Sequence, residues 1–242
     1  MSADVVAIAQ PTFLPWAGWF DLADQVDLLI VLDDVAFSKQ SWQQRNRLRT
    51  AEGLRHVTVP VRTAGRLGQR ILDTEIADSD AIDKLILTVA QNYSRAAHFS
   101  RFFGEFSAVL RQSAAGGMLA DVNCGLIAWL GAQLGIATPQ VRSSELAVEG
   151  KRGALIAKLC ERVGATRYLS PAGAEEYLIE DRAEFDRRAI AVELQVYEHP
   201  VYRQCFQPFM PYASVLDLLM NEGDGAAAIL RSGRRPPRML NS

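Results

Sequence analysis

The stretch 5-VVAIAQPTFLPWAGWFDLADQVDLLIVLDD-34 decides the fold. Residues 5–10 and 28–34 are apolar runs with the length of buried strands, and the segment after Gly18 has helical character. A strand, a loop, a helix and a second strand in this order form the opening unit of a parallel sheet. The stretch therefore predicts an α/β fold whose first strand leads into a loop stiffened by two prolines.

The rest of the chain continues this alternation. Further strands are predicted at 56–60, 139–144, 166–170 and 189–198, and helices at 81–93, 98–112, 118–134, 153–164 and 214–223. Right-handed crossovers would place the helices on both faces of one sheet. We expect a single Rossmann-like α/β domain over 1–242, with a mostly parallel sheet of five or six strands and a mainly helical insertion near 76–135. The ending GRRPPRMLNS lacks an apolar pattern and predicts a loose tail.

The composition is typical of a folded protein. Hydrophobic residues make up 49% and charged residues 22% of the chain. The start MSADVV lacks the features of a secretory signal, and no apolar run approaches the ~20 residues of a membrane span. We therefore expect a cytoplasmic protein. The three cysteines include no CxxC pair, so neither a disulfide framework nor a structural metal site is predicted.

Arginine is concentrated in one segment, although the net charge of −2 gives no general attraction to a polyanion. Between positions 45 and 70 a single acid, Glu52, stands against Arg45, Arg47, Arg49, Arg55, Arg62, Arg66 and Arg70. Two interpretations remain open. The segment is either a solvated basic face or a phosphate-binding surface, because the planar guanidinium suits phosphate.

Polar residues follow the predicted strands at the places where ligands bind in open parallel sheets, beyond the carboxyl ends of the strands. These candidate residues are Gln10 with Pro15, Trp16 and Gly18 of the next loop, then Asp33, Asp34, Ser144, Ser170 and His199. The loop after the first strand presents free amide groups toward an anionic ligand, but it contains neither a P-loop nor a GxGxxG pattern. Trp16 would stack on a base or a sugar face, or pack into the core.

Several of these side chains suggest particular chemistry. Asp33 and Asp34 would bind sugar hydroxyls, hold a metal or cap a turn, and alternation directs only one of them to the cleft. His199 suits a general base because histidine titrates near neutrality, although an unpartnered histidine also serves structural roles. Tyr202 and Gln204 follow it closely in the chain. The donors Lys39, Asn46 and Arg47 match phosphate or carboxylate, or are surface charge.

Six separate stretches resemble the WbqC-like family of bacterial proteins. In order from about residue 6 to residue 225 they are QPTFLPWAGWFD, LDDVAFSKQSWQQRNRLR, VTVPV, RSSEL, GATRYLSPAGAEEYL and HPVYRQCFQPFMPYASVLDLLMNEG. The family's motif positions include most of the candidates above and also Tyr168, Tyr177, Ser214 and Asp217. Phe13 and Trp19 stand where family members often have tyrosine.

The resemblance implies a role in O-antigen, other glycan or natural-product biosynthesis, with transfer from an activated sugar or acyl donor. We expect a transferase that moves an acyl or aminoacyl group from a small-molecule donor to the amine of an amino sugar or nucleotide sugar. His199, Asp34 and Lys39 are the predicted catalytic residues, with His199 as general base. Asn46 and Arg47 would join Lys39 in holding phosphate.

Two alternatives stay open. One is a nucleotidyl or phosphoryl transferase that uses Mg²⁺ as its cofactor, with Asp33 or Asp34 as ligand. The other is a non-catalytic partner protein that binds a sugar nucleotide or tRNA. The arginine-rich segment also allows an aminoacyl-tRNA as the donor, although the overall charge does not favour it. The sequence does not predict an oligomeric state.

Overall fold

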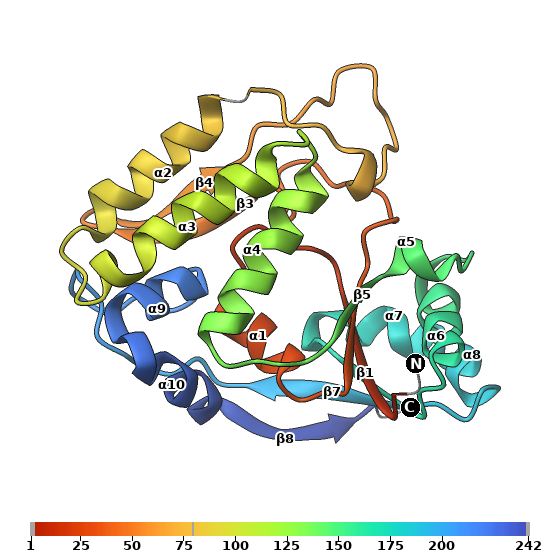
Figure 1. Cartoon of the computed structure of the whole chain (residues 1–242). Coiled ribbons are helices and arrows are strands. Elements are labelled where there is room, and N and C mark those ends of the chain that lie inside the picture. The colour runs from red at the N-terminus through yellow and green to blue at the C-terminus, as the bar shows by residue number, and fades with distance from the viewer. Residues whose placement is uncertain (1–2, 79, 241–242) are drawn as a thin grey trace.

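A six-stranded sheet forms the centre of the computed structural model, which describes residues 3–78 and 80–240 (Figure 1). Its strand order is β5-β2-β1-β6-β7-β8. The bounds are β1 Val5–Ala9, β2 Leu28–Val31, β5 Gln140–Arg142, β6 Arg167–Ser170, β7 Ala191–Tyr197 and β8 Arg234–Met239. All neighbouring pairs are parallel except β7 and β8. The predicted α/β class with a mostly parallel sheet is confirmed.

The helices are α1 Ala17–Ala23, α2 Asp80–Tyr93, α3 Phe99–Ala114, α4 Leu119–Gln133, α5 Ser143–Leu146, α6 Arg152–Arg162, α7 Glu175–Glu180, α8 Arg182–Asp186, α9 Val215–Glu222 and α10 Ala226–Ser232. Six of them, α1, α2, α3, α4, α6 and α9, follow the predicted segments closely, whereas α5, α7, α8 and α10 were not among those segments. Short 3₁₀ turns lie at Ile71–Asp73, Ala172–Ala174 and Gly223–Gly225. Ser214 caps α9 by accepting a hydrogen bond from the amide of Leu216 at 3.2 Å, and Gly164 follows α6 with φ +73°, a conformation that commonly ends a helix.

Each face of the sheet carries its own hydrophobic core, because successive side chains of a strand point to opposite faces. Val6 and Ile8 of β1 belong to the core under α6, α7 and α8, whereas Ala7 and Ala9 belong to the core that includes α1, α4, α9 and α10. Figure 1 shows these two groups of helices on opposite sides of the strands. The sheet is therefore covered on both faces.

The helices α2, α3 and α4 fill the segment expected to be helical, between the hairpin described next and β5. On α4 and just beyond its end, the apolar residues at helical spacing are all buried: Leu119, Val122, Leu126, Leu130 and Leu134. Within 3–78 and 80–240, no helix combines the length and the apolar character that crossing a bilayer requires.

The strand predicted at 56–60 does not join the main sheet. It is part of β4, Gly53–Thr58, which pairs antiparallel with β3, Arg45–Thr50, in a separate hairpin. The tight turn explains this pairing. Gly53 adopts φ +113°, and the Thr50 hydroxyl donates to the Gly53 carbonyl at 2.9 Å while it accepts from the Glu52 amide at 3.2 Å. Two strands joined this closely pair with each other.

The prediction of a loose C-terminal tail is wrong, because Arg234–Met239 form the edge strand β8. The register of β8 against β7 shifts between Leu194 and Val196, opposite the two prolines of the tail. Proline is tolerated on an edge strand at such an irregularity because no ladder hydrogen bond is lost there. Arg234 also anchors the strand by donating to the buried Asp21 carboxylate of α1 at 2.8 Å.

Candidate functional site

Asp33 at the end of β2 is a buried structural carboxylate. It is 0% exposed and accepts hydrogen bonds from the Ser144 amide at 3.1 Å and the Ser144 hydroxyl at 3.0 Å. The Ser143 hydroxyl contacts Asp33 at 3.2 Å and Asp34 at 2.5 Å. These bonds join the end of β2 to the start of α5. Since they occupy the oxygens of Asp33, Asp34 is the member of the pair that a ligand would meet.

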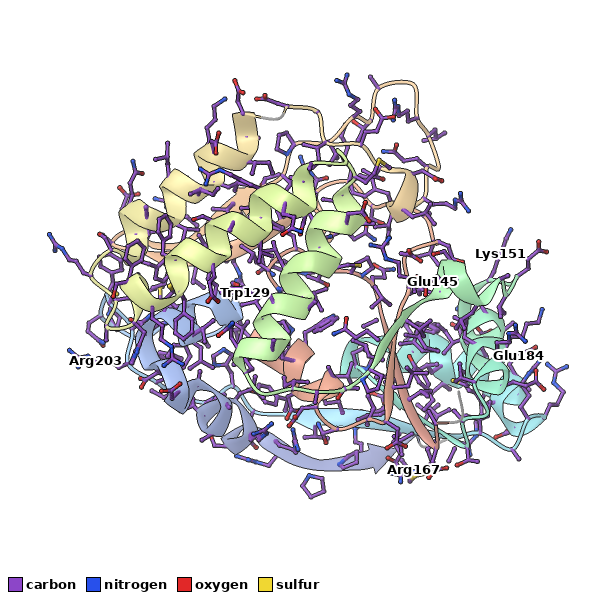
Figure 2. The ribbon with its side chains drawn as sticks, viewed as in Figure 1. Trp129, Glu145, Lys151, Arg167, Glu184 and Arg203 are labelled. Carbon is purple, nitrogen blue, oxygen red and sulfur yellow. The ribbon has the colours of Figure 1, made fainter. Side chains whose placement is uncertain are left out.

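Asp34 lies in a cavity of about 470 Å³ that is also lined by Arg70 and Lys151. Figure 2 places Lys151 on the side of the molecule formed by α5 and α6. In the sheet order, β2 and β7 are three strand spacings apart, or roughly 14 Å. The candidate residues after these two strands, Asp34 and His199, therefore lie at separate parts of the sheet edge.

A second cavity of about 220 Å³ contains several of the candidate residues, and we call it the aromatic pocket. It is lined by Thr12, Trp16, Trp19, Trp42, Asn46, Arg47 and Tyr212. Its walls come from the loop after β1 with the start of α1, from the start of the β3–β4 hairpin, and from the segment before α9. The amide of Val215 donates to the Pro15 carbonyl at 2.8 Å and that of Ser214 to the Arg47 carbonyl at 2.9 Å, which ties the three segments together.

Buried amide side chains hold the first two walls in place. Asn46 donates to the Phe13 carbonyl at 2.9 Å, and Asn123 of α4 donates to both the Pro11 and Gln43 carbonyls at 2.8 Å. The exposed Gln10 accepts from the Gln43 side chain at 2.8 Å. Asn46 and Gln10 thus have structural partners in addition to their predicted ligand roles, which stay predictions.

Gly18 allows Trp16 to take its position in the pocket wall. A Cβ atom at position 18 would lie 2.3 Å from Cη2 of the Trp16 indole, closer than real Cβ contacts. The indole therefore covers the first turn of α1 at a place where no other residue type leaves room. This steric requirement explains why a glycine stands inside a buried helix, where it costs about 0.5–1 kcal/mol relative to alanine.

Two hydrogen-bond donors in the pocket walls have no partner. Among the described residues, nothing accepts from the Trp19 indole N–H or the Arg47 Nε–H, although both atoms are buried. Trp19 is only 8% exposed. A buried donor without a partner costs roughly 1–3 kcal/mol.

His199 lies behind two residues that line the aromatic pocket. Its ring stacks on Trp16, with centroids 6.2 Å apart and planes 15° apart, and meets the ring of Tyr212 edge-on at 5.2 Å. Its Nδ1 is 2.9 Å from the Pro200 carbonyl oxygen, which can only accept, so Nδ1 carries the proton and Nε2 keeps its lone pair. Burial lowers the pKa of His199, and the neutral ring therefore prevails at pH 7.

A buried polar network supports His199 from the other side. The ring of Tyr202 lies 6.1 Å from that of His199, and its hydroxyl donates to Asp217 at 2.7 Å. Gln204 donates to the same carboxylate oxygen at 2.8 Å. Burial raises the pKa of Asp217. Tyr202 and Gln204 thus serve as support beneath the histidine. Asp217 is directed into this network and not to the start of its own helix.

The remaining predicted residues lie apart from the aromatic pocket. Ser170 is buried at the end of β6 and donates to the Pro171 carbonyl at 3.2 Å. Lys39 is exposed and lines a cavity of about 430 Å³ with Arg66. Within 3–78 and 80–240, no group of three or more His, Cys, Asp or Glu side chains is arranged to hold a metal ion.

The arginine-rich segment is largely neutralised. Arg49 is buried, and ion pairs join Arg55 to Glu52, Arg62 and Arg66 to Glu75, and Arg70 to Asp73. Two of the three acids, Asp73 and Glu75, lie just beyond the segment, so a count restricted to residues 45–70 missed them. In the described parts of the chain, no carboxylate pairs with the two remaining arginines, Arg45 and Arg47. Binding of a polyanion by this segment stays a prediction.

Sequence reasoning did not select Trp42 and Tyr212, which complete the aromatic pocket. Each is 49% exposed. Both stand in polar or proline-containing stretches, SWQQ and MPYAS, where a large aromatic residue has no core to enter. That context is a usable signal for a ligand-facing side chain. Tyr212 also adopts φ +67°, a strained conformation for a bulky residue, and its ring lies against both Trp16 and His199.

Comparison with known proteins agrees with these motifs. The WbqC-like protein family matches residues 10–229. The uncharacterized protein Rv1507c of Mycobacterium tuberculosis is 35% identical over 231 residues, which cover 95% of this chain and 99% of that protein. No solved structure matches the chain significantly. The matched region includes the aromatic pocket, His199 and the network beneath it, and the chain belongs to the WbqC-like protein family.

Proposed function

We propose that the protein is a transferase of bacterial cell-surface glycan or secondary-metabolite biosynthesis. It transfers an acyl or aminoacyl group to the amine of a nucleotide-linked amino sugar. The observation that supports this proposal most is the aromatic pocket, in which flat aromatic walls and the charged side chain of Arg47 lie in front of a neutral histidine. A sugar ring would place its apolar face on these walls and its acceptor oxygens near the Arg47 guanidinium.

His199 is the general base in this proposal. The amine of the sugar attacks the carbonyl carbon of the donor, a C–N bond forms, and the bond from that carbon to the leaving group breaks. The proton lost by the amine passes to Nε2 of His199, and the leaving group departs with the electron pair of the broken bond. The Pro200 carbonyl holds the Nδ1 proton and so keeps the lone pair at Nε2.

The surrounding residues position the sugar. Trp16 and Tyr212 line the pocket and contact the imidazole that lies behind them. The proposal therefore requires the amine of a sugar held in the pocket to reach Nε2 past the edges of these two rings. Arg47 supplies a positive charge at the pocket wall. Lys39 and Asp34 lie in other cavities, and their predicted catalytic roles would require the ligand to extend beyond the pocket.

A magnesium-dependent nucleotidyl or phosphoryl transferase is the second candidate function. It is supported by the cavity that brings Asp34 next to Arg70 and Lys151, a combination suited to a metal-bound phosphate. Titration with Mg²⁺ separates the two candidates. Under the first proposal, adding EDTA leaves turnover unchanged, whereas under the second it abolishes turnover.

The variant His199→Gln tests the acyl-transfer proposal. The protein is incubated with acyl-coenzyme A and dTDP- or UDP-linked amino sugars, and the N-acylated product is measured by mass spectrometry. Loss of a positioned general base lowers turnover by about a hundredfold or more, with little change in KM. His98→Gln, at the start of α3, is the matched control and keeps full turnover. Equal turnover in wild type and His199→Gln removes the proposed base.

A further inference from the structure

One outer face of the β3–β4 hairpin adjoins the mouth of the aromatic pocket, and we call it the hairpin face. It consists of Trp42, Arg45, Arg47 and His56. Arg45 and Arg47 alternate along β3 and therefore share a side, and Arg47 stands opposite His56 in the register. The Arg47 guanidinium carbon lies 5.3 Å from the centroid of Trp42, and the His56 ring lies 6.1 Å from it.

The hairpin face carries positive charge that the protein does not neutralise. In the described parts of the chain, neither Arg45 nor Arg47 has a carboxylate partner, whereas Arg55 on the same hairpin pairs with Glu52 at 2.7 Å. Burial and the nearby charges of Arg45 and Arg47 lower the pKa of His56. The charges of the two arginines are thus concentrated at one place beside a ligand-sized cavity.

The size of the aromatic pocket leaves this face for the rest of a larger ligand. Pockets that enclose a whole drug-sized molecule have volumes of about 300–1,000 Å³. The aromatic pocket, at about 220 Å³, holds roughly one ring. Trp42 belongs to both regions, because it lines the pocket and is 49% exposed. The part of a larger ligand that does not fit in the pocket would extend over the hairpin face.

We propose that the hairpin face binds a nucleoside diphosphate group. Arg45 and Arg47 contact the two phosphates, and the base stacks on the exposed part of Trp42. Guanidinium groups form strong charge-assisted hydrogen bonds to phosphate oxygens, and every nucleobase offers a flat face to an aromatic ring. The assignment of a sugar to the adjoining pocket rests on the proposed function, but the diphosphate site itself requires no transfer reaction.

Isothermal titration calorimetry tests this site with UDP, dTDP, GDP, CDP, uridine and pyrophosphate as probes. At least one nucleoside diphosphate is expected to bind more tightly than both uridine and pyrophosphate, since it alone engages the arginines and the tryptophan. Arg45→Gln is expected to weaken its binding about tenfold or more. Trp42→Ala is expected to weaken it at least about fivefold while leaving pyrophosphate affinity unchanged. Arg55→Gln is the matched control and leaves affinity unchanged.

Three results would overturn the proposal. If the nucleoside diphosphates bind no better than pyrophosphate, the base does not stack on Trp42. If Arg45→Gln and Arg55→Gln weaken diphosphate binding equally, the loss reflects only the change in overall charge and not a contact with Arg45. Unchanged binding in both Arg45→Gln and Trp42→Ala places the nucleotide elsewhere. His199→Gln keeps the diphosphate affinity in every case, so failure of the transferase proposal, seen as unchanged turnover in that variant, is distinguishable from failure of this site.

Discussion

Replacing Gly18 with alanine tests whether the wall of the aromatic pocket depends on the close contact between Trp16 and α1. The added Cβ would lie 2.3 Å from Cη2, 2.4 Å from Cζ2 and 2.8 Å from Cζ3 of the indole, so the ring must move. Overpacking of this kind costs about 1–3 kcal/mol. The gain in helix propensity from glycine to alanine offsets about 0.5–1 kcal/mol of that.

Gly104→Ala is the matched control, because Gly104 lies within α3 and a Cβ there meets no atom within 4 Å. It is expected to raise the free energy of unfolding by about 0.5–1 kcal/mol. We expect urea denaturation to give a free energy of unfolding that is about 1–3 kcal/mol lower for Gly18→Ala than for Gly104→Ala. The near-ultraviolet circular dichroism of the tryptophans should change only in Gly18→Ala. Equal stability of the two variants would refute the reasoning that Gly18 makes room for Trp16.

Three further variants test the polar groups that support the site. Asn123→Ala leaves the Pro11 and Gln43 carbonyls without their hydrogen-bond donor, so urea denaturation should show a free energy of unfolding lower by about 2–4 kcal/mol. A loss below about 1 kcal/mol would contradict the role of Asn123 in joining the pocket walls. Arg234→Ala removes the anchor of β8 on Asp21 and should lower the free energy of unfolding by about 1.5–3 kcal/mol, and wild-type stability would show that the tail needs no anchor. Asp217 has a raised pKa in the folded state, so its carboxyl contributes stability that is fully present below the ordinary value of 3.8 and is lost as the pH rises through the raised pKa. Asp217→Asn should therefore flatten the dependence of stability on pH above about pH 4, and an unchanged pH profile would contradict the assignment.

Much of the fold follows from local sequence patterns. The predicted strand segments 5–10, 28–34, 139–144, 166–170 and 189–198 each contain one of the parallel strands, and α2, α3 and α4 lie where helices were expected. Two strands escaped this reasoning for physical reasons. The pairing of β3 with β4 depends on turn geometry at Gly53, and β8 is stabilised by distant partners such as Asp21 that its own residues do not reveal.

The candidate site was predictable only in part. The rule that ligands bind beyond the carboxyl ends of strands selected residues along the whole sheet edge, but it carries no information on their separation across the sheet. The position of Asp33 at a strand end suggested that it binds a ligand, but in the structure its carboxylate accepts hydrogen bonds from Ser143 and Ser144. Trp42 and Tyr212 come from loops whose mutual approach only the folded chain defines.

A crystal structure of the protein with a bound UDP-linked amino sugar tests the account most directly. We expect the sugar ring between Trp16, Trp42 and Arg47, with its amine directed to Nε2 of His199. Density for the ligand in the cavity of Asp34, Arg70 and Lys151, with the aromatic pocket empty, would contradict the assignment of the site.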